Sequence, residues 1–138
     1  MAVENLWGDL PLDDIQPTPL AILKTQAIAL EEQSRGLLTG RVNTTSGINS
    51  EEKEVFIHIF SLLAPALGNY SVEVLRAVHP IELYPVRLRD SMSDRIVVAH
   101  DDAGLKEQVG RILQSDRLRQ VIKSLLSQIA DVKTVAAH

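Results

Sequence analysis

The sequence predicts one α+β domain, with an antiparallel sheet of about five strands, one N-terminal helix and two C-terminal helices packed on it. Apolar residues recur with helical spacing near both ends of the chain, and short alternating segments separated by turn residues fill the middle. Strands joined by short turns pair antiparallel, and helices at the two ends then cover the sheet. We expect residues 1–17 to be an irregular arm and residues 18–138 to be a single domain, because 138 residues fit one domain.

The arm holds two prolines, four acids and several large apolar side chains. It has no basic n-region followed by an apolar stretch, so we do not expect a signal peptide. A pure linker has no need of Trp7 and Leu10. We therefore expect the arm to pack on the domain or on a second subunit.

The first helix is marked by Thr18 as N-cap, Pro19 at the first helical position and Gly40 beyond the end. Its apolar stripe runs from Leu20 to Leu37 at spacings of three and four. A strand over 41–45 and a turn around Gly47 follow.

The next strand, over 55–62, is apolar on both faces, which indicates a strand covered on both sides by its own domain or by a second subunit. Its two alternating sets are Val55, Ile57 and Ile59 on one face, and Phe56, His58 and Phe60 on the other.

Three shorter strands complete the predicted sheet. Gly68-Asn69 predicts a hairpin turn, and the segment that follows alternates until a bulge near Leu75-Arg76. Residues 82–89 place Tyr84, Val86 and Leu88 inward, with Pro85 typical of an edge strand or a strand start. A turn over 90–94 leads to the last strand, at 96–99.

Two helices end the chain. Asp101 and Asp102 cap a helix over 103–114, and Ser115 caps the next. Six apolar residues from Leu118 to Ile129 alternate at spacings of three and one, which is the strongest helical pattern in the chain. We expect residues 132–138 to fray.

Composition excludes several classes of site. The absence of cysteine excludes disulfides, a thiol nucleophile and thiolate zinc sites. The net charge of −4 makes nucleic acid an unfavourable partner. No apolar run approaches the roughly 20 residues that span a bilayer. We therefore expect a cytoplasmic protein without a membrane partner.

Catalytic motifs are missing too. There is no G-x-S-x-G turn and no phosphate-binding glycine loop. Glu73 and Glu82 lack the lysine two residues later that a magnesium nuclease would need. His100, Asp101 and Asp102 carry possible metal ligands, but capping explains the two acids, so we expect no metal and no cofactor.

One basic cluster stands out on the predicted sheet, made of Arg76, Arg87, Arg89 and Arg95. Guanidinium groups on one face can hold a phosphate or an acidic peptide through paired hydrogen bonds. The alternative is a solvated face that Glu82, Asp90 and Asp94 neutralise.

These features favour a non-catalytic protein-interaction domain, adaptor-like or chaperone-like and homodimeric, that binds itself or another protein. The interface candidates are Trp7, Phe56, His58 and Phe60, or the opposite set Val55, Ile57 and Ile59. In size, acidity and α+β layout the chain is similar to small bacterial secretion chaperones, although no motif carries that likeness.

The alternative function is a small-molecule-binding protein or an enzyme with a polar pocket between sheet and helices. Its candidate residues are His79, Glu82 and His100, together with Arg87. Acid–base chemistry needs such groups to converge on one point. A pocket lined by these side chains would favour this alternative.

Overall fold

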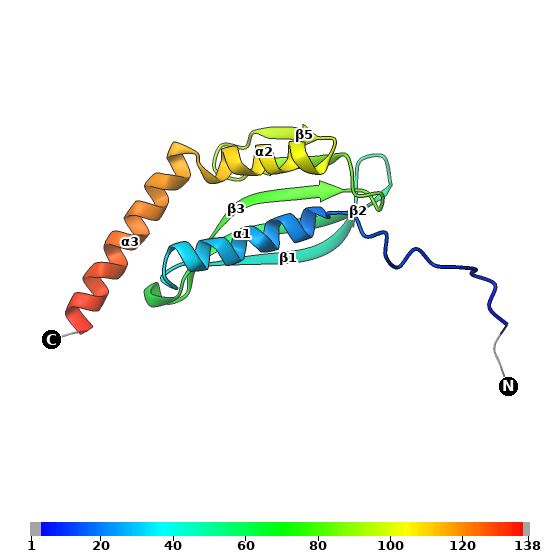
Figure 1. Cartoon of the computed structure of the whole chain (residues 1–138). Helices are drawn as coiled ribbons and strands as arrows, with labels where there is room; N and C mark the ends of the chain where they lie inside the picture. The colour runs from blue at the N-terminus through cyan, green and yellow to red at the C-terminus, as the bar shows by residue number, and fades with distance from the viewer. Residues whose placement is uncertain (1–3, 137–138) are drawn as a thin grey trace.

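The computed structural model describes residues 4–136 and confirms the predicted α+β fold (Figure 1). The elements, in chain order, are α1 (Pro19–Gln33), β1 (Thr39–Ile48), β2 (Glu54–Ala64), the short 3-10 helix η1 (Pro65–Leu67), β3 (Tyr70–His79), β4 (Val86–Asp90), β5 (Ile96–Ala99), α2 (Asp102–Leu113) and α3 (Asp116–Ala136).

The five strands form one antiparallel meander in which each strand pairs with its neighbours in sequence. The register between β2 and β3 shifts once, because Phe60 pairs with Leu75 and Ser61 pairs with Glu73. Val74 is therefore the extra residue of a bulge, one position before the predicted site. The bulge lets Val74 and Leu75 both be buried, although they are neighbours in a strand.

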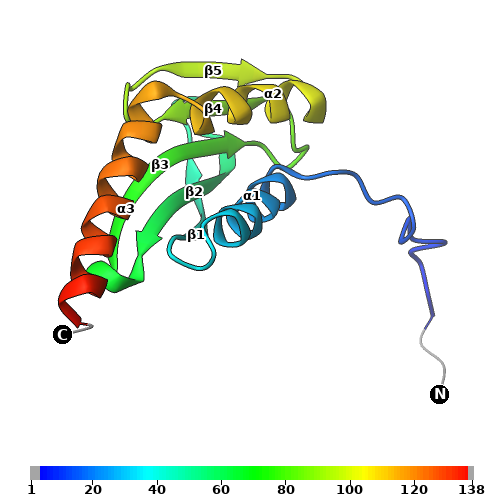
Figure 2. The ribbon, with the colours of Figure 1, turned by 60° about the vertical axis from the view of Figure 1, so that its left-hand side comes forward.

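All three helices lie on the same side of this sheet (Figure 2). The core fills the space between the helices and that face of the sheet. Its members come from the helices and from alternating strand positions, and include Leu23, Phe60, Leu62, Leu75, Leu88, Leu105 and Ile129. We call the strand positions that contribute to this core the covered face.

Helix α1 begins as predicted but ends early. Thr18 accepts a hydrogen bond from the Ala21 N–H through its hydroxyl, and Pro19 follows as the first helical residue. The helix stops at Gln33, because Arg35 and Gly36 adopt positive φ angles. The prediction of helix up to Leu37 was wrong, since left-handed backbone cannot continue an α-helix.

Helix α1 approaches the sheet closely at Gly40. A Cβ at this position would lie 2.7 Å from the Ala27 Cα and 2.8 Å from the Ala27 Cβ. The apparent stop signal at Gly40 is therefore a packing requirement, which places α1 against β1.

Two strand boundaries also differ from the prediction. β1 continues through Gly47 to Ile48, and the turn lies at 49–53, where the Asn49 side chain accepts from the N–H groups of Glu51 and Lys53. β4 starts only at Val86, after the cis peptide bond that precedes Pro85. The hairpin at Gly68-Asn69 is confirmed, since both residues have positive φ.

The C-terminal helices follow the predicted caps. The Asp101 carboxylate accepts from the Gly104 N–H, and the Ser115 hydroxyl accepts from the Leu118 N–H. Helix α3 continues to Ala136, so the frayed tail is not seen up to that residue, and 137–138 lie outside the described residues. No helix within residues 4–136 is long and apolar enough to cross a membrane.

The arm, residues 4–17, contains no helix or strand and runs away from the body of the protein (Figure 1). Its apolar side chains are exposed, and Trp7 has 80% of its surface accessible. The arm therefore does not pack on its own domain. The other expectation, packing on a second subunit, stays a prediction.

Candidate functional site: the uncovered face of the sheet

Within residues 4–136, no helix or strand lies over the face of the sheet that points away from the helices (Figure 2). Paired residues in an antiparallel sheet share a face, so the register defines this surface as two rows across all five strands. One row is Thr45, Ile57, Val78, Arg87 and Val98, and the other is Asn43, Ile59, Arg76, Arg89 and Ile96. Two shorter rows continue the surface over β1 to β3, namely Arg41, Ser61 and Glu73, and Thr39, Leu63 and Ser71. We call these four rows together the bare face.

The centre of the bare face is apolar, and charged residues flank it on β3 and β4. Ile57, Ile59 and Val78 lie at its centre, and none belongs to the core or packs against it. Ile96 and Val98, on the edge strand β5, are 50% and 47% exposed. Arg76, Arg87 and Arg89 separate this apolar centre from Ile96 and Val98. Apolar side chains grouped on an open sheet face make that face a candidate interaction surface.

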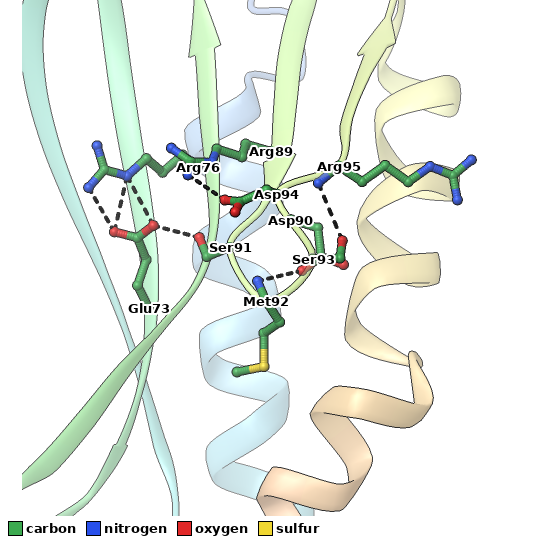
Figure 3. Close-up of polar contacts among 9 residues, drawn as sticks. All are labelled: Glu73, Arg76, Arg89, Asp90, Ser91, Met92, Ser93, Asp94 and Arg95. Carbon is green, nitrogen blue, oxygen red and sulfur yellow. Dashed lines mark hydrogen bonds and ion pairs between the residues drawn. The ribbon is translucent and has the colours of Figure 1, made fainter.

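Glu73, at the bulge, accepts hydrogen bonds from Arg76 and Ser91 on the bare face (Figure 3). The Arg76 Nε donates to both Glu73 carboxylate oxygens at 3.0 Å, and Arg76 Nη2 lies 2.9 Å from Oε1. The Ser91 hydroxyl donates to the same carboxylate. The hydrogen bond from Arg76 is the main cause that holds the pKa of Glu73 below its ordinary value, and the Ser91 hydroxyl adds to it.

The four predicted arginines do not form one cluster. Arg76 and Arg89 face each other across β3 and β4, and Arg87 lies on the same face two residues along β4. Arg95 extends away from the side chains of Arg76 and Arg89 (Figure 3). Three of the four predicted residues therefore share the bare face.

Most of this positive charge is already neutralised. Glu73 pairs with Arg76, and Asp94 pairs with Arg89. Among residues 4–136, Arg87 makes no ion pair. One free guanidinium is a weak basis for a phosphate site, so the apolar rows are the more informative feature of the bare face.

The two buried histidines lie on the covered face as diagonal neighbours on β2 and β3, where His79 pairs with Phe56 and His58 pairs with Ala77. His58 Nε2 and His79 Nε2 are 2.8 Å apart. His79 Nδ1 lies 2.7 Å from the Pro80 carbonyl oxygen, and His58 Nδ1 lies 2.9 Å from the Thr44 hydroxyl. We call this series of hydrogen bonds the histidine chain.

The partners in the histidine chain determine where its protons lie. The Pro80 carbonyl can only accept, so His79 donates from Nδ1 and its Nε2 is left as an acceptor. His58 then donates from Nε2 and accepts from the Thr44 hydroxyl through Nδ1. Burial, and next the charge of His79, lower the pKa of His58 to about 4. Each ring nitrogen of the two buried imidazoles thus has a hydrogen-bond partner.

The structure places the predicted interface residues on different surfaces of the protein. Phe60 and His58 are buried beneath the helices, and Phe56 lies on the same covered face, with its ring centroid 5.7 Å from that of His79. Of the two alternating sets along β2, the one on the bare face is Val55, Ile57 and Ile59, and its first member, Val55, is buried at 6% exposure. Trp7 is exposed on the arm.

A groove opens on the opposite side of the molecule. Helix α1 borders it on one side, and α3 together with the end of α2 borders it on the other. Its volume is about 820 Å³. The covered face supplies its floor through Phe60, Leu62 and Val74, and Ile122 and Leu126 of α3 form one wall. Sequence reasoning missed the groove, although the broad apolar stripe of α3 exceeds what one contact with the sheet can bury.

The predicted pocket residues do not line this groove. His79 is engaged in the histidine chain, Glu82 lies in the turn after β3, and His100 is exposed beyond β5. The described residues contain no group of three His, Asp or Glu side chains that could hold a metal ion. Asp101, next to His100, is occupied in capping α2.

The comparisons with known proteins give no family for this chain. No protein-family model matches it, and no curated protein or solved structure matches it either.

Proposed function

We propose that the protein is a non-catalytic protein-interaction domain of the adaptor or chaperone-like kind, which forms homodimers through the bare face. The observation that carries this proposal is the apolar centre formed by Ile57, Ile59 and Val78, over which no helix of residues 4–136 lies. Covering such a face removes apolar surface from water at about 25 cal/mol per Å².

The size of the bare face suits a second copy. Three strands of ten or eleven residues and two of four or five residues, spaced about 4.8 Å apart, give a flat area of roughly 600 Å². A standard protein interface buries about 800 Å² on each partner. Two sheets packed face to face would therefore use most of this surface, as in a sandwich about 10 Å thick.

Charge does not oppose this arrangement strongly. Arg76 and Arg89 carry their own counter-ions into the interface, because Glu73 and Asp94 belong to the same subunit. Arg87 is exposed on β4 between Val78 and Val98 of the same row, so the proposed dimer requires a partner or a trapped water for its guanidinium.

Sedimentation equilibrium of the full chain tests the dimer. The expected mass is twice the 15.2 kDa of one chain. Ile59→Asp and, separately, Val98→Asp should return the mass to that of one chain, because each places a carboxylate within the apolar rows. Ile81→Asp, in the exposed turn after β3, is the matched control and should stay dimeric. A wild-type mass of one chain at every concentration contradicts the proposal.

The second candidate function is binding of a small molecule between sheet and helices. The groove favours it, because about 820 Å³ lies in the range of ligand pockets. Its lining is largely apolar and lacks His79, Glu82 and His100. A ligand there would be held by apolar contact, with Arg119 and Lys123 at the rim, and the site offers no acid–base pair for catalysis.

A further inference from the structure

The arm and the groove both leave apolar side chains accessible to water, and their charges are opposite. The arm exposes five large apolar side chains within ten residues, namely Leu6, Trp7, Leu10, Leu12 and Ile15. Each is more than half exposed. Within residues 4–136, the arm is the longest stretch without helix or strand. Its exposed apolar side chains are therefore not buried by the domain that follows.

The groove offers a complementary surface of suitable depth. Phe60, Leu62 and Val74 lie at its floor, below the level of the helices, and Ile122 and Leu126 stand beside them. An indole and a leucine side chain that enter the groove can contact apolar atoms on three sides, which a flat surface does not allow.

Charge strengthens the match. Residues 4–17 carry Glu4, Asp9, Asp13 and Asp14 and no lysine or arginine. The groove lining carries Arg119 and Lys123 and no acid. An arm of charge −4 would therefore meet a rim of charge +2, an attraction that steers the arm toward this groove and weakens with salt.

We propose that the arm of one copy docks in the groove between α1 and α3 of a second copy. The junction between the arm and α1 favours exchange over docking in its own groove. Pro17 and Pro19 restrict Gln16 and Thr18 to extended backbone, and Thr18 is held at φ −102° and ψ 154° by its capping role. The chain thus leaves α1 pointing away from the body, as in Figure 2.

The arm is long enough to exchange within a dimer formed by the bare faces. Fourteen extended residues span up to about 46 Å. Two packed sheets about 10 Å apart, each with a helical layer about 10 Å thick, separate the two groove layers by roughly 30 Å. The exchange does not depend on that dimer, however, because the groove and the bare face lie on opposite sides of the sheet.

Trp7 is the single tryptophan of the chain, so its fluorescence reports on the arm alone. In the full-length protein, we expect the emission to shift to shorter wavelength as the concentration rises and Trp7 leaves water. Arg119→Glu with Lys123→Glu should abolish the shift. Both side chains are exposed, so the fold should persist, which circular dichroism checks. Arg117→Glu with Lys106→Glu makes the same charge change outside the groove lining and should keep the shift.

Mixing two variants distinguishes exchange from docking in the same chain. One variant keeps Trp7 and carries the two groove reversals, and the other has Trp7→Ser and an intact groove. Neither alone can show a buried indole. On mixing, the emission should shift to shorter wavelength, because the intact arm of the first variant enters the groove of the second.

Three results would overturn the proposal. Wild-type emission of an exposed indole at all concentrations means that the arm does not dock. A shift that survives the groove reversals places the arm elsewhere, for example on the bare face. A wild-type shift that is independent of concentration, with no change on mixing, means docking within one chain. Comparing Ile59→Asp with Trp7→Ser separates this proposal from the previous one. A dimer mass that Ile59→Asp lowers and Trp7→Ser leaves unchanged depends on the bare face, and the reverse pattern depends on the arm.

Discussion

The two faces of the sheet have almost the same apolar content along β2 and entirely different surroundings. Leu62 and Leu63 are neighbours in one strand, yet Leu62 is 1% exposed in the core and Leu63 lies on the bare face, outside the core. The covered face also buries two histidines, whereas the bare face keeps its charges at the surface. The difference indicates that the covered face supports folding, and it is the basis of the proposal that the bare face contacts a second chain.

The largest expected effect compares these two leucines. Leu62→Ala should lower the free energy of unfolding by about 2–5 kcal/mol, because it leaves a cavity in the core. Leu63→Ala should cost less than about 1 kcal/mol in the isolated chain. Urea denaturation of both variants, at a concentration low enough to keep single chains, measures the difference. Equal costs would mean that the bare face belongs to the folding core.

The histidine chain predicts a pH dependence that belongs to the covered face. The pKa of His58 is about 4 in the folded protein and near 6.5 in the unfolded chain, so protons bind the unfolded state preferentially between these values. The contribution to stability is complete above about pH 6.5 and is lost as the pH falls toward 4. We expect a loss of about 3 kcal/mol at pH 4.

Unfolding experiments between pH 7 and pH 4 check this prediction. His58→Gln removes the titrating group and should flatten the slope, whatever its effect on stability at pH 7. His100→Gln changes an exposed histidine and serves as the control that keeps the slope. A wild-type slope that His58→Gln leaves intact would assign the pH dependence to other groups.

Two glycines in β1 give a matched test of close packing on the two faces. Gly40→Ala should destabilise the fold by about 1–3 kcal/mol, because the new methyl group would overlap the backbone of α1 at Ala27. Gly47→Ala meets only the end of the Ile57 side chain, at 3.1 Å, which can rotate into open space. Thermal unfolding should therefore show a loss for the first variant and none beyond about 0.5 kcal/mol for the second.

The smallest effect concerns the ion pair on the bare face. Glu73→Gln should cost about 0.5–1 kcal/mol, because its partner Arg76 is partly exposed and solvent screens the pair. The lowered pKa of Glu73 means that this contribution is present above its ordinary value of 4.5 and is lost as the pH falls below it. Denaturation at pH 7 and pH 3 tests both points, and a cost that grows on acidification would contradict them.

The sequence alone predicted the three helices and five strands and their order along the chain. Alternation along 86–90 and the helical spacing of Leu118 to Ile129 report local backbone directly, and Thr18 and Asp101 mark helix starts with their own side chains. The end of α1 was missed because Arg35 takes a positive φ, which its residue type does not favour.

The functional surfaces depended on contacts between distant residues. β2 is apolar on both sides, so its alternation cannot tell which side meets helices. His58 and His79 are 21 positions apart and meet only through the register of β2 and β3. The groove lies between α1 and α3, which are near opposite ends of the sequence. No local sequence pattern could therefore predict that these helices lie on either side of a groove.

The most direct test of the bare face as an interface is the solvent accessibility of its isoleucine methyl groups. A soluble paramagnetic probe broadens the NMR signals of methyl groups that it can approach. We predict that the Ile57 and Ile59 methyl groups become protected as the protein concentration rises, while the methyl groups of Ile81, in the exposed turn, stay accessible. Ile57 and Ile59 signals that remain as accessible at high concentration as at low concentration would contradict the account.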